Sequence, residues 1–146
     1  WIKNPEPYGG SAMLQRIKEA RESNASELDL GGFFNISDLT PLAGAGLTNL
    51  KYLYLEYNNV SDLTPLAEIT SLTAIDFYGN NISDLTPLVG LTNLNWLGLE
   101  ANSISDLTPL ARLTNLRTLF LANNNFSDSQ KTMLREALPY VEVSWY

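Results

Sequence analysis

Leucine and other apolar residues recur in one pattern through the middle of the chain, L-x-x-L-x-L-x-x-N-x-I. One copy runs from Leu50 to Val60, and further copies begin at 22-residue intervals, at Leu72, Leu94 and Leu116. The alternation in L-x-L has the period of a short strand with one buried face. One such strand per copy, always in the same direction, predicts a parallel sheet built from stacked repeats.

An S-D-L-T-P-L segment separates successive strands, and the first repeat is two residues longer because "AG" is inserted near Ala45. The threonine hydroxyl is expected to cap a first helical turn that the following proline favours by its fixed φ. Too few residues follow for a long helix, which predicts a short 3₁₀ turn on the outer face. One aspartate per repeat does not supply the six to eight oxygens that calcium requires, so turn formation explains these residues better. The aspartates are Asp38, Asp62, Asp84 and Asp106.

The whole pattern is the leucine-rich-repeat signature. With its short repeat and S-D-L-T-P-L segment, the chain resembles the bacterial internalin-like group of leucine-rich-repeat proteins over roughly residues 28–126. The resemblance implies a curved solenoid that binds partners and has no chemistry of its own. It slightly favours a secreted or cell-surface protein and leaves the cytoplasm open.

The expected fold is therefore α/β, a horseshoe-shaped leucine-rich-repeat solenoid. A parallel sheet lines its concave face, short 3₁₀ or turn segments form the convex face, and helical caps close both ends. A single domain of residues 1–146 is expected, with caps at 1–26 and 127–146 and repeats at 27–126. The asparagine that ends each strand is predicted to bond the backbone of neighbouring turns in a buried ladder. These asparagines are Asn58, Asn80, Asn102 and Asn124.

Helical spacing in "SAMLQRIKEARESN" predicts the N-terminal cap, with Ser11 as its N-cap. Its apolar positions are Met13, Leu14, Ile17 and Ala20 or Arg21. An irregular first strand should then bury Leu28 and Leu30, with Gly31–Gly32 absorbing one extra residue as a bulge.

The C-terminal cap is predicted as a helix followed by the final strand, "YVEVSWY". Its apolar stripe consists of Met133, Leu134, Ala137 and Leu138. If the 22-residue period continues, Leu119 aligns with Val141 and Leu121 with Val143.

Residues between the inward-facing leucines should face the concave side of the sheet, where they form contiguous columns. Many are aromatic or acidic, and a patch of aromatics rimmed by carboxylates is a common composition for a binding site. The small residue Gly98 is expected to leave a pit among larger neighbours. Glu27, Asp29, Ala74, Ala122 and Ser144 extend the surface. The candidate binding residues are Tyr52, Tyr54, Glu56, Asp76, Tyr78, Trp96, Gly98, Glu100, Thr118, Phe120, Tyr140 and Glu142.

Composition narrows the possible functions. The net charge is −7, and no segment clusters lysine and arginine, so nucleic-acid binding is not expected. The absence of cysteine and histidine excludes structural zinc and a Ser-His-Asp triad in their usual forms, and no cofactor is expected. No apolar run is long enough to span a membrane. The chain begins without methionine or an apolar signal region, which suggests that an upstream segment has been removed.

The sequence thus predicts a non-catalytic module that binds a protein or peptide, and the acidic face favours a basic or amphipathic partner. Carbohydrate is the second candidate ligand, because aromatic faces and carboxylates also suit sugars. An engineered or structural scaffold without a specific ligand is the third interpretation. An inverting glycosidase is a further interpretation, because strand geometry predicts a spacing of about 8 Å between Glu56 and Asp76. Burial that would raise the pKa of either carboxylate is not expected on an open sheet.

Overall fold

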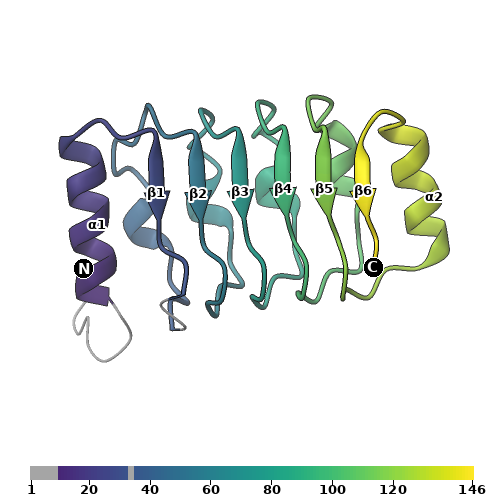
Figure 1. Cartoon of the computed structure of the whole chain (residues 1–146), viewed down its shortest axis with the longest axis horizontal. Coiled ribbons are helices and arrows are strands. Elements are labelled where there is room, and N and C mark those ends of the chain that lie inside the picture. The colour runs from purple at the N-terminus through teal and green to yellow at the C-terminus, as the bar shows by residue number, and fades with distance from the viewer. Residues whose placement is uncertain (1–9, 33–34) are drawn as a thin grey trace.

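Six short parallel strands form one sheet along the molecule, and each strand pairs with the next one in sequence (Figure 1). The computed structural model describes residues 10–32 and 35–146. Helices α1 (Gly10–Glu22) and α2 (Asp128–Ala137) lie at the two ends of the row. The strands are β1 (Glu27–Asp29), β2 (Tyr52–Tyr54), β3 (Ala74–Asp76), β4 (Trp96–Gly98), β5 (Thr118–Phe120) and β6 (Glu142–Ser144).

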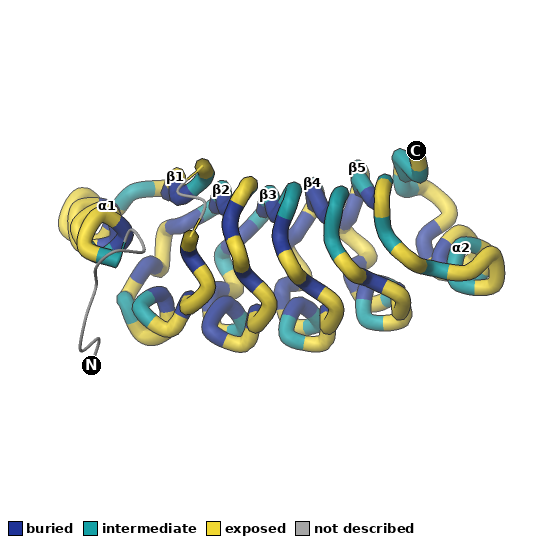
Figure 2. The backbone as a smooth tube through the Cα atoms, turned by 90° about the horizontal axis from the view of Figure 1, so that it is seen from below, coloured by how far each residue is buried: buried dark blue, intermediate teal, exposed yellow. Residues whose placement is uncertain are grey.

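Short 3₁₀ segments cross the side of the coil opposite the sheet. Figure 2 shows buried positions between these two sides, and the row of strands bends gently with the sheet on the inside of the curve. The predicted solenoid, with its parallel sheet, short turns and two helices, is therefore confirmed. The 3₁₀ segments are η1 (Thr40–Leu42), η2 (Thr64–Leu66), η3 (Thr86–Leu88) and η4 (Thr108–Arg112).

The core between sheet and turns is filled by the repeated leucines, and the strand-ending asparagines satisfy its backbone. Asn80 donates from Nδ2 to the carbonyls of Leu55 (2.9 Å) and Phe77 (3.1 Å), and its Oδ1 accepts from the Val60 N–H (2.9 Å). The same set of bonds recurs at the other three positions, so the predicted asparagine ladder is confirmed.

A second polar ladder, which the leucine pattern did not predict, runs along the segments before β2, β3, β4 and β5. Asn93 donates from Nδ2 to the Thr70 carbonyl (2.9 Å), and Asn115 donates to the Thr92 carbonyl (2.7 Å). Asn49 makes the equivalent bond, and at the repeat that has serine instead, Ser71 donates to the Leu50 carbonyl (2.6 Å). The recurrence of L-T-N-L was the available signal.

The convex turns begin differently from the prediction. The threonine hydroxyl does not cap the turn, since each segment has leucine at its N-cap without a side-chain cap bond. Instead, the Asp62 carboxylate accepts from the Thr64 N–H at 2.9 Å. Hydrogen bonds from the Thr64 hydroxyl and N–H lower the pKa of Asp62. The role of the aspartates in turn formation is thus confirmed, and the side chain that accepts from the backbone at the start of each turn is aspartate rather than threonine.

The N-terminal cap differs in detail from the prediction. Helix α1 begins at Gly10, so Ser11 lies inside it and is not its N-cap. Met13, Ile17 and Ala20 are buried. Leu14 is only partly buried and Arg21 is exposed. After β1, the Gly31–Gly32 pair forms a turn rather than a bulge: Gly32 has φ +71° and donates to the Glu56 carbonyl at 2.8 Å.

The C-terminal strand exists, but its predicted register is wrong by two residues. Leu119 pairs with Val143, and Glu142 and Ser144 lie beside Thr118 and Phe120. The last crossing needs more residues because α2 advances only about 1.5 Å per residue, less than the extended chain of the other repeats. Within the predicted apolar stripe, Leu134 and Leu138 are buried and Met133 is partly buried, whereas Ala137 is exposed.

Candidate binding face of the sheet

The strand register places the predicted outward residues in three columns across the sheet. The first contains Glu27, Tyr52, Ala74, Trp96, Thr118 and Glu142. The second contains Asp29, Tyr54, Asp76, Gly98, Phe120 and Ser144. Backbone hydrogen bonds continue this register past the strand ends and give a third column, Glu56, Tyr78, Glu100 and Ala122.

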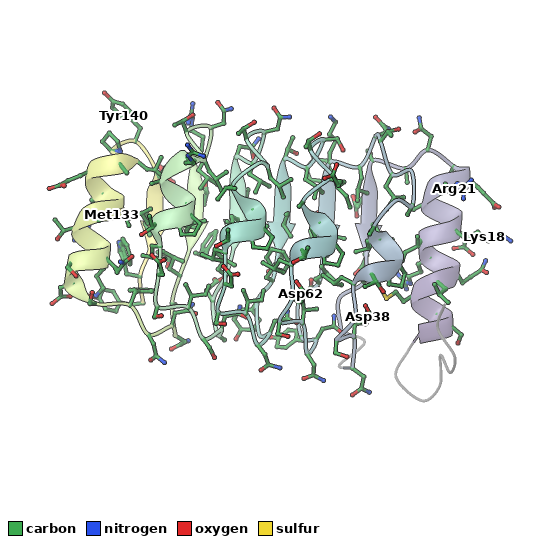
Figure 3. The ribbon with its side chains drawn as sticks, turned by 180° about the vertical axis from the view of Figure 1, so that it is seen from behind. Lys18, Arg21, Asp38, Asp62, Met133 and Tyr140 are labelled. Carbon is green, nitrogen blue, oxygen red and sulfur yellow. The ribbon has the colours of Figure 1, made fainter. Side chains whose placement is uncertain are left out.

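Tyr140 is the one candidate residue that the structure removes from these columns. The shifted register of β6 leaves it in the turn before the strand, where it is 88% exposed. It borders an open groove of about 500 Å³ with Arg117 and Pro139. Figure 3, which views the molecule from behind the sheet, shows Tyr140 at the top of the α2 end. Its assignment to the concave face is therefore wrong.

Two pairs of aromatic rings contact each other at the face. The Trp96 and Phe120 ring centroids lie 5.4 Å apart with the planes inclined by 47°. Tyr57 and Tyr78 meet edge to face at 5.0 Å and 73°. Such pairs hold large rings in fixed positions and supply contact area at a low entropic cost. Tyr52 remains 43% exposed at the β2 end of the face.

Gly98 does not leave the predicted pit, because it is buried beneath a neighbouring side chain. A Cβ at this position would lie 2.9 Å from both Trp96 Cη2 and Asp76 Oδ1. The indole of Trp96 therefore lies over Gly98 toward the second column, and the glycine is required for that placement. The Trp96 indole and the Asp76 carboxylate therefore fill the space that was expected to be open.

Three carboxylates on the face are partly withdrawn from water. Burial raises the pKa values of Asp76, Glu56 and Glu100, and the negative charge of Asp76 adds to the shift for both glutamates. For Asp76 the increase is opposed by the Tyr78 N–H, which donates to its Oδ1 at 2.9 Å. The expectation that nothing would bury Glu56 or Asp76 is thus wrong, because burial in the folded chain raises the pKa of both.

Glu56 is the most constrained of these acids. Its carboxylate lies directly against Gly31 in the turn after β1, where any added side chain would collide with it. Its Oε2 is buried without a hydrogen-bond partner among residues 10–32 and 35–146. On the same face, Asp29 lies near the Arg16 guanidinium (Nη1–Oδ2 3.9 Å).

An additional groove lies on the other side of the molecule, between α1 and η1. It has a volume of about 830 Å³ and is lined by Leu14, Lys18, Arg21, Asp38, Pro41 and Ala45. The two-residue insertion of the first repeat forms one of its walls. Figure 3 shows Lys18 and Arg21 on the helix, and Asp38 and Asp62 along the row of turns. The insertion is visible in the sequence, whereas the groove is not.

The described residues contain no group of three or more acidic side chains placed to hold a metal ion. Within the same part of the chain, no helix has the length and apolar character needed to cross a membrane.

Comparisons with known proteins agree with the repeat architecture. Residues 26–68 and 48–90 match the family described as Leucine Rich repeats (2 copies), and residues 115–136 match Leucine Rich Repeat. The chain belongs to the leucine-rich-repeat family. Within this family it is internalin-like and similar to bacterial proteins. A search of curated proteins found no sequence match.

Solved structures of bacterial proteins share the fold. Internalin C2 from Listeria monocytogenes is 37% identical with a TM-score of 0.73, covering 87% of this chain and 55% of its own. An internalin, inlF, from the same species is 32% identical with a TM-score of 0.73, covering 87% and 36%. A leucine-rich-repeat protein from Leptospira interrogans is 25% identical with a TM-score of 0.69, covering 76% and 29%. The chain thus spans about half or less of the length of these proteins. Leucine-rich-repeat proteins are generally protein-binding modules.

Proposed function

We propose that this chain is a non-catalytic module that binds a protein or peptide through the aromatic and acidic face of its sheet. The observation that carries the proposal is the arrangement of that face. Two aromatic contacts, Trp96 with Phe120 and Tyr57 with Tyr78, lie on the same side of the sheet as the acids of its central strands, which make no ion pair within residues 10–32 and 35–146. These acids are Glu56, Asp76 and Glu100. Fixed rings provide contact area, and unpaired charge favours a basic or amphipathic partner.

The alternative of catalysis is weaker, although Glu56 and Asp76 both have raised pKa values. General acid catalysis requires a site from which water is largely excluded around the reacting group. Each described segment of this chain is a turn of the solenoid or one of its two capping helices, and none forms a roof over the sheet. An open face of this kind suits the recognition of another surface.

The test compares partner capture by the wild-type chain and by Tyr54→Ala/Trp96→Ala/Phe120→Ala. A matched control, Glu68→Ala/Arg112→Ala, alters exposed residues of the convex side. Each captured protein is then purified, and its Kd is measured with all three chains. Binding through the face predicts a Kd at least about tenfold weaker for the face variant and unchanged for the control.

Two results would contradict the proposal. The first is a partner whose Kd is the same for the face variant and the wild type, because it would bind elsewhere. The second is selective binding on a glycan array without any protein partner, which would indicate carbohydrate recognition. Circular dichroism spectra of the three chains verify that each remains folded.

A further inference from the structure

The sheet has a free backbone donor at its last strand, β6. Along the sheet, the N–H just after each strand donates to the carbonyl that ends the next strand. These bonds run from Leu55 to Asp76, Phe77 to Gly98, Leu99 to Phe120 and Leu121 to Ser144. Trp145 holds the next position of the series, and its N–H has no acceptor among residues 10–32 and 35–146. A sheet edge with free backbone groups can pair with a strand of another chain.

The side chain of the same residue, Trp145, is fixed against the α2 end of the molecule. Its ring meets the Phe126 ring edge to face, with the centroids 5.4 Å apart and the planes inclined by 73°. The Arg135 guanidinium of α2 lies over the indole, 5.1 Å from its centroid. The position that carries the free donor is therefore tied to the helix through its ring.

Lys131, one helical turn before Arg135, lies among three aromatic rings. Its Nζ is 5.9 Å from the centroids of both Phe126 and Trp145, and 5.3 Å from that of Tyr146. Ring faces attract a cation, and the attraction is stronger where the cation is withdrawn from water. The Lys131 side chain is only 18% exposed, whereas lysine is seldom buried in folded proteins.

The ion pair of Lys131 does not account for this placement. Asp128 Oδ1 lies 3.6 Å from its Nζ, but the Asp128 side chain is 99% exposed, and such pairs contribute little. The rings come from both ends of the crossing, since Phe126 precedes α2 and the other two residues follow β6. A cation among them therefore joins the helix to the last strand.

This contact closes the end of the solenoid. A hydrogen bond from the Leu107 N–H to Gln130 Oε1 (2.7 Å) holds α2 on the preceding turn, and the Glu142 N–H donates to the Arg117 carbonyl (2.8 Å) and holds β6 on β5. Figure 1 shows α2 beyond β6 at this end of the row. A helix that covers a sheet edge is one of the means by which proteins prevent strand addition.

The five residues of this contact are named here the aromatic–cation lock, and they are Phe126, Lys131, Arg135, Trp145 and Tyr146. We propose that the aromatic–cation lock keeps α2 on the end of the sheet and thereby prevents β6 from pairing with a second copy of this chain. When the lock is released, β6 separates more often from β5, and the free N–H of Trp145 becomes accessible to another strand. The proposal concerns the end of the solenoid and does not depend on the binding face.

The first test measures amide hydrogen exchange by NMR in Lys131→Gln/Arg135→Gln, which removes both cations and keeps all three rings. Exchange of the Glu142 amide should become about tenfold faster than in the wild type, whereas the Phe77 amide in the middle of the sheet should be unchanged. An unchanged rate for Glu142 would overturn the lock. Trp145→Leu removes one ring instead and should have the same effect. If it unfolds, the charge variant decides.

Two matched controls separate the lock from a general effect of charge. Lys18→Gln/Arg21→Gln removes two exposed cations from α1, with the same change in net charge. Asp128→Asn removes the ion pair of Lys131 and leaves the rings in place. Both controls should show the wild-type exchange rate at Glu142, and a tenfold increase in either would overturn the assignment to the rings.

The second test measures oligomeric state by sedimentation at increasing protein concentration. The wild type and the controls should remain monomeric, whereas Lys131→Gln/Arg135→Gln should form dimers in which the Trp145 amide becomes protected from exchange. A lock variant with faster Glu142 exchange that stays monomeric throughout would overturn the role of the lock in preventing association. Dimers without protection at Trp145 would do the same, because they would form elsewhere on the molecule.

Discussion

The pKa values of two sets of acids, on opposite sides of this solenoid, are shifted in opposite directions. Asp62, Asp84 and Asp106 on the convex side accept hydrogen bonds from the hydroxyl and N–H of the threonine two residues later, which lowers their pKa values. On the sheet side, burial raises the pKa values of Glu56 and Glu100, as it does for Asp76. The convex set is satisfied within its own turn, whereas the sheet set lacks an ion-pair partner among the described residues.

The contrast separates residues that build the repeat from residues that distinguish one repeat from another. The convex aspartates occupy the same position in each S-D-L-T-P-L segment, and so do the asparagines of the ladder. The acids of the sheet occupy variable positions and cost the fold some stability. We therefore expect changes at constant positions to reduce stability and neutralisation of the acids at variable positions to increase it, and four experiments test how the two kinds of position contribute to stability.

The largest effect is expected from the asparagine ladder. Asn80→Ala removes two donated bonds, to the Leu55 and Phe77 carbonyls, and one accepted from the Val60 N–H, all in the interior. Leaving these groups unsatisfied should lower the free energy of unfolding by about 2–4 kcal/mol, measured by urea denaturation. The control Asn95→Ala changes an exposed asparagine and should stay within about 0.5 kcal/mol. Equal losses at both positions would contradict a structural role confined to the ladder.

A smaller loss is expected at Gly98, the variable position that also supports its neighbours. In Gly98→Ala the new Cβ meets the Trp96 ring and the Asp76 carboxylate at 2.9 Å, so the indole must move. Because the ring edge can rotate away, the cost should be about 1–2 kcal/mol, together with a shifted Trp96 indole N–H signal in NMR spectra. Gly90→Ala is the matched control, since nothing lies within 4 Å of its Cβ position. An unmoved Trp96 signal would show that the indole does not depend on Gly98.

The strands, turns and asparagine ladder were predictable because one period repeats and each copy verifies the others. The prediction was wrong at β6, where α2 replaces a 3₁₀ turn and the pairing of Leu119 moves to Val143. The 22-residue period applies where a 3₁₀ turn joins two strands. It does not predict how many residues a crossing needs when it contains a helix. It therefore also placed Tyr140 on the wrong surface.

The columns of the sheet face followed from alternation, but their chemistry did not. Whether Trp96 lies over Gly98 depends on a rotamer, and alternation only says which face a side chain leaves from. The raised pKa values of Glu56 and Asp76 depend on how far neighbouring side chains exclude water. The alternation of residue types along a strand does not predict that extent of burial. The second ladder, at Asn49, Asn93 and Asn115, was visible as a recurrence but needed the structure to reveal its carbonyl partners.

Identical substitutions on the two sides should change stability with opposite signs. Asp84→Asn weakens a hydrogen bond to the Thr86 N–H (2.8 Å) by removing the charge, and should lower Tm. Asp76→Asn keeps an oxygen for the Tyr78 N–H but removes a partly desolvated charge, and should raise Tm. Both changes should be about 1–2 °C after allowing for solvent screening, measured by calorimetry. A decrease of similar size in both variants would remove the distinction between the two sets of acids.

The smallest effect is the dependence of stability on pH. Because the pKa values of Glu56, Asp76 and Glu100 are raised, the folded chain binds protons before the unfolded chain does. As pH falls from 7 toward their unfolded values of 4.5 for glutamate and 3.8 for aspartate, these groups should increase the free energy of unfolding. The stabilisation from Asp62, Asp84 and Asp106 is present above 3.8 and is lost as pH falls through their lower folded pKa values.

The opposing signs predict a stability maximum at mildly acidic pH, which urea denaturation at a series of pH values can locate. In Glu56→Gln/Asp76→Asn/Glu100→Gln the increase above the maximum should flatten, because the groups that take up protons there are gone. The decrease below it should remain, since the convex aspartates are intact. A variant with an unchanged pH profile would mean that other carboxylates produce the maximum.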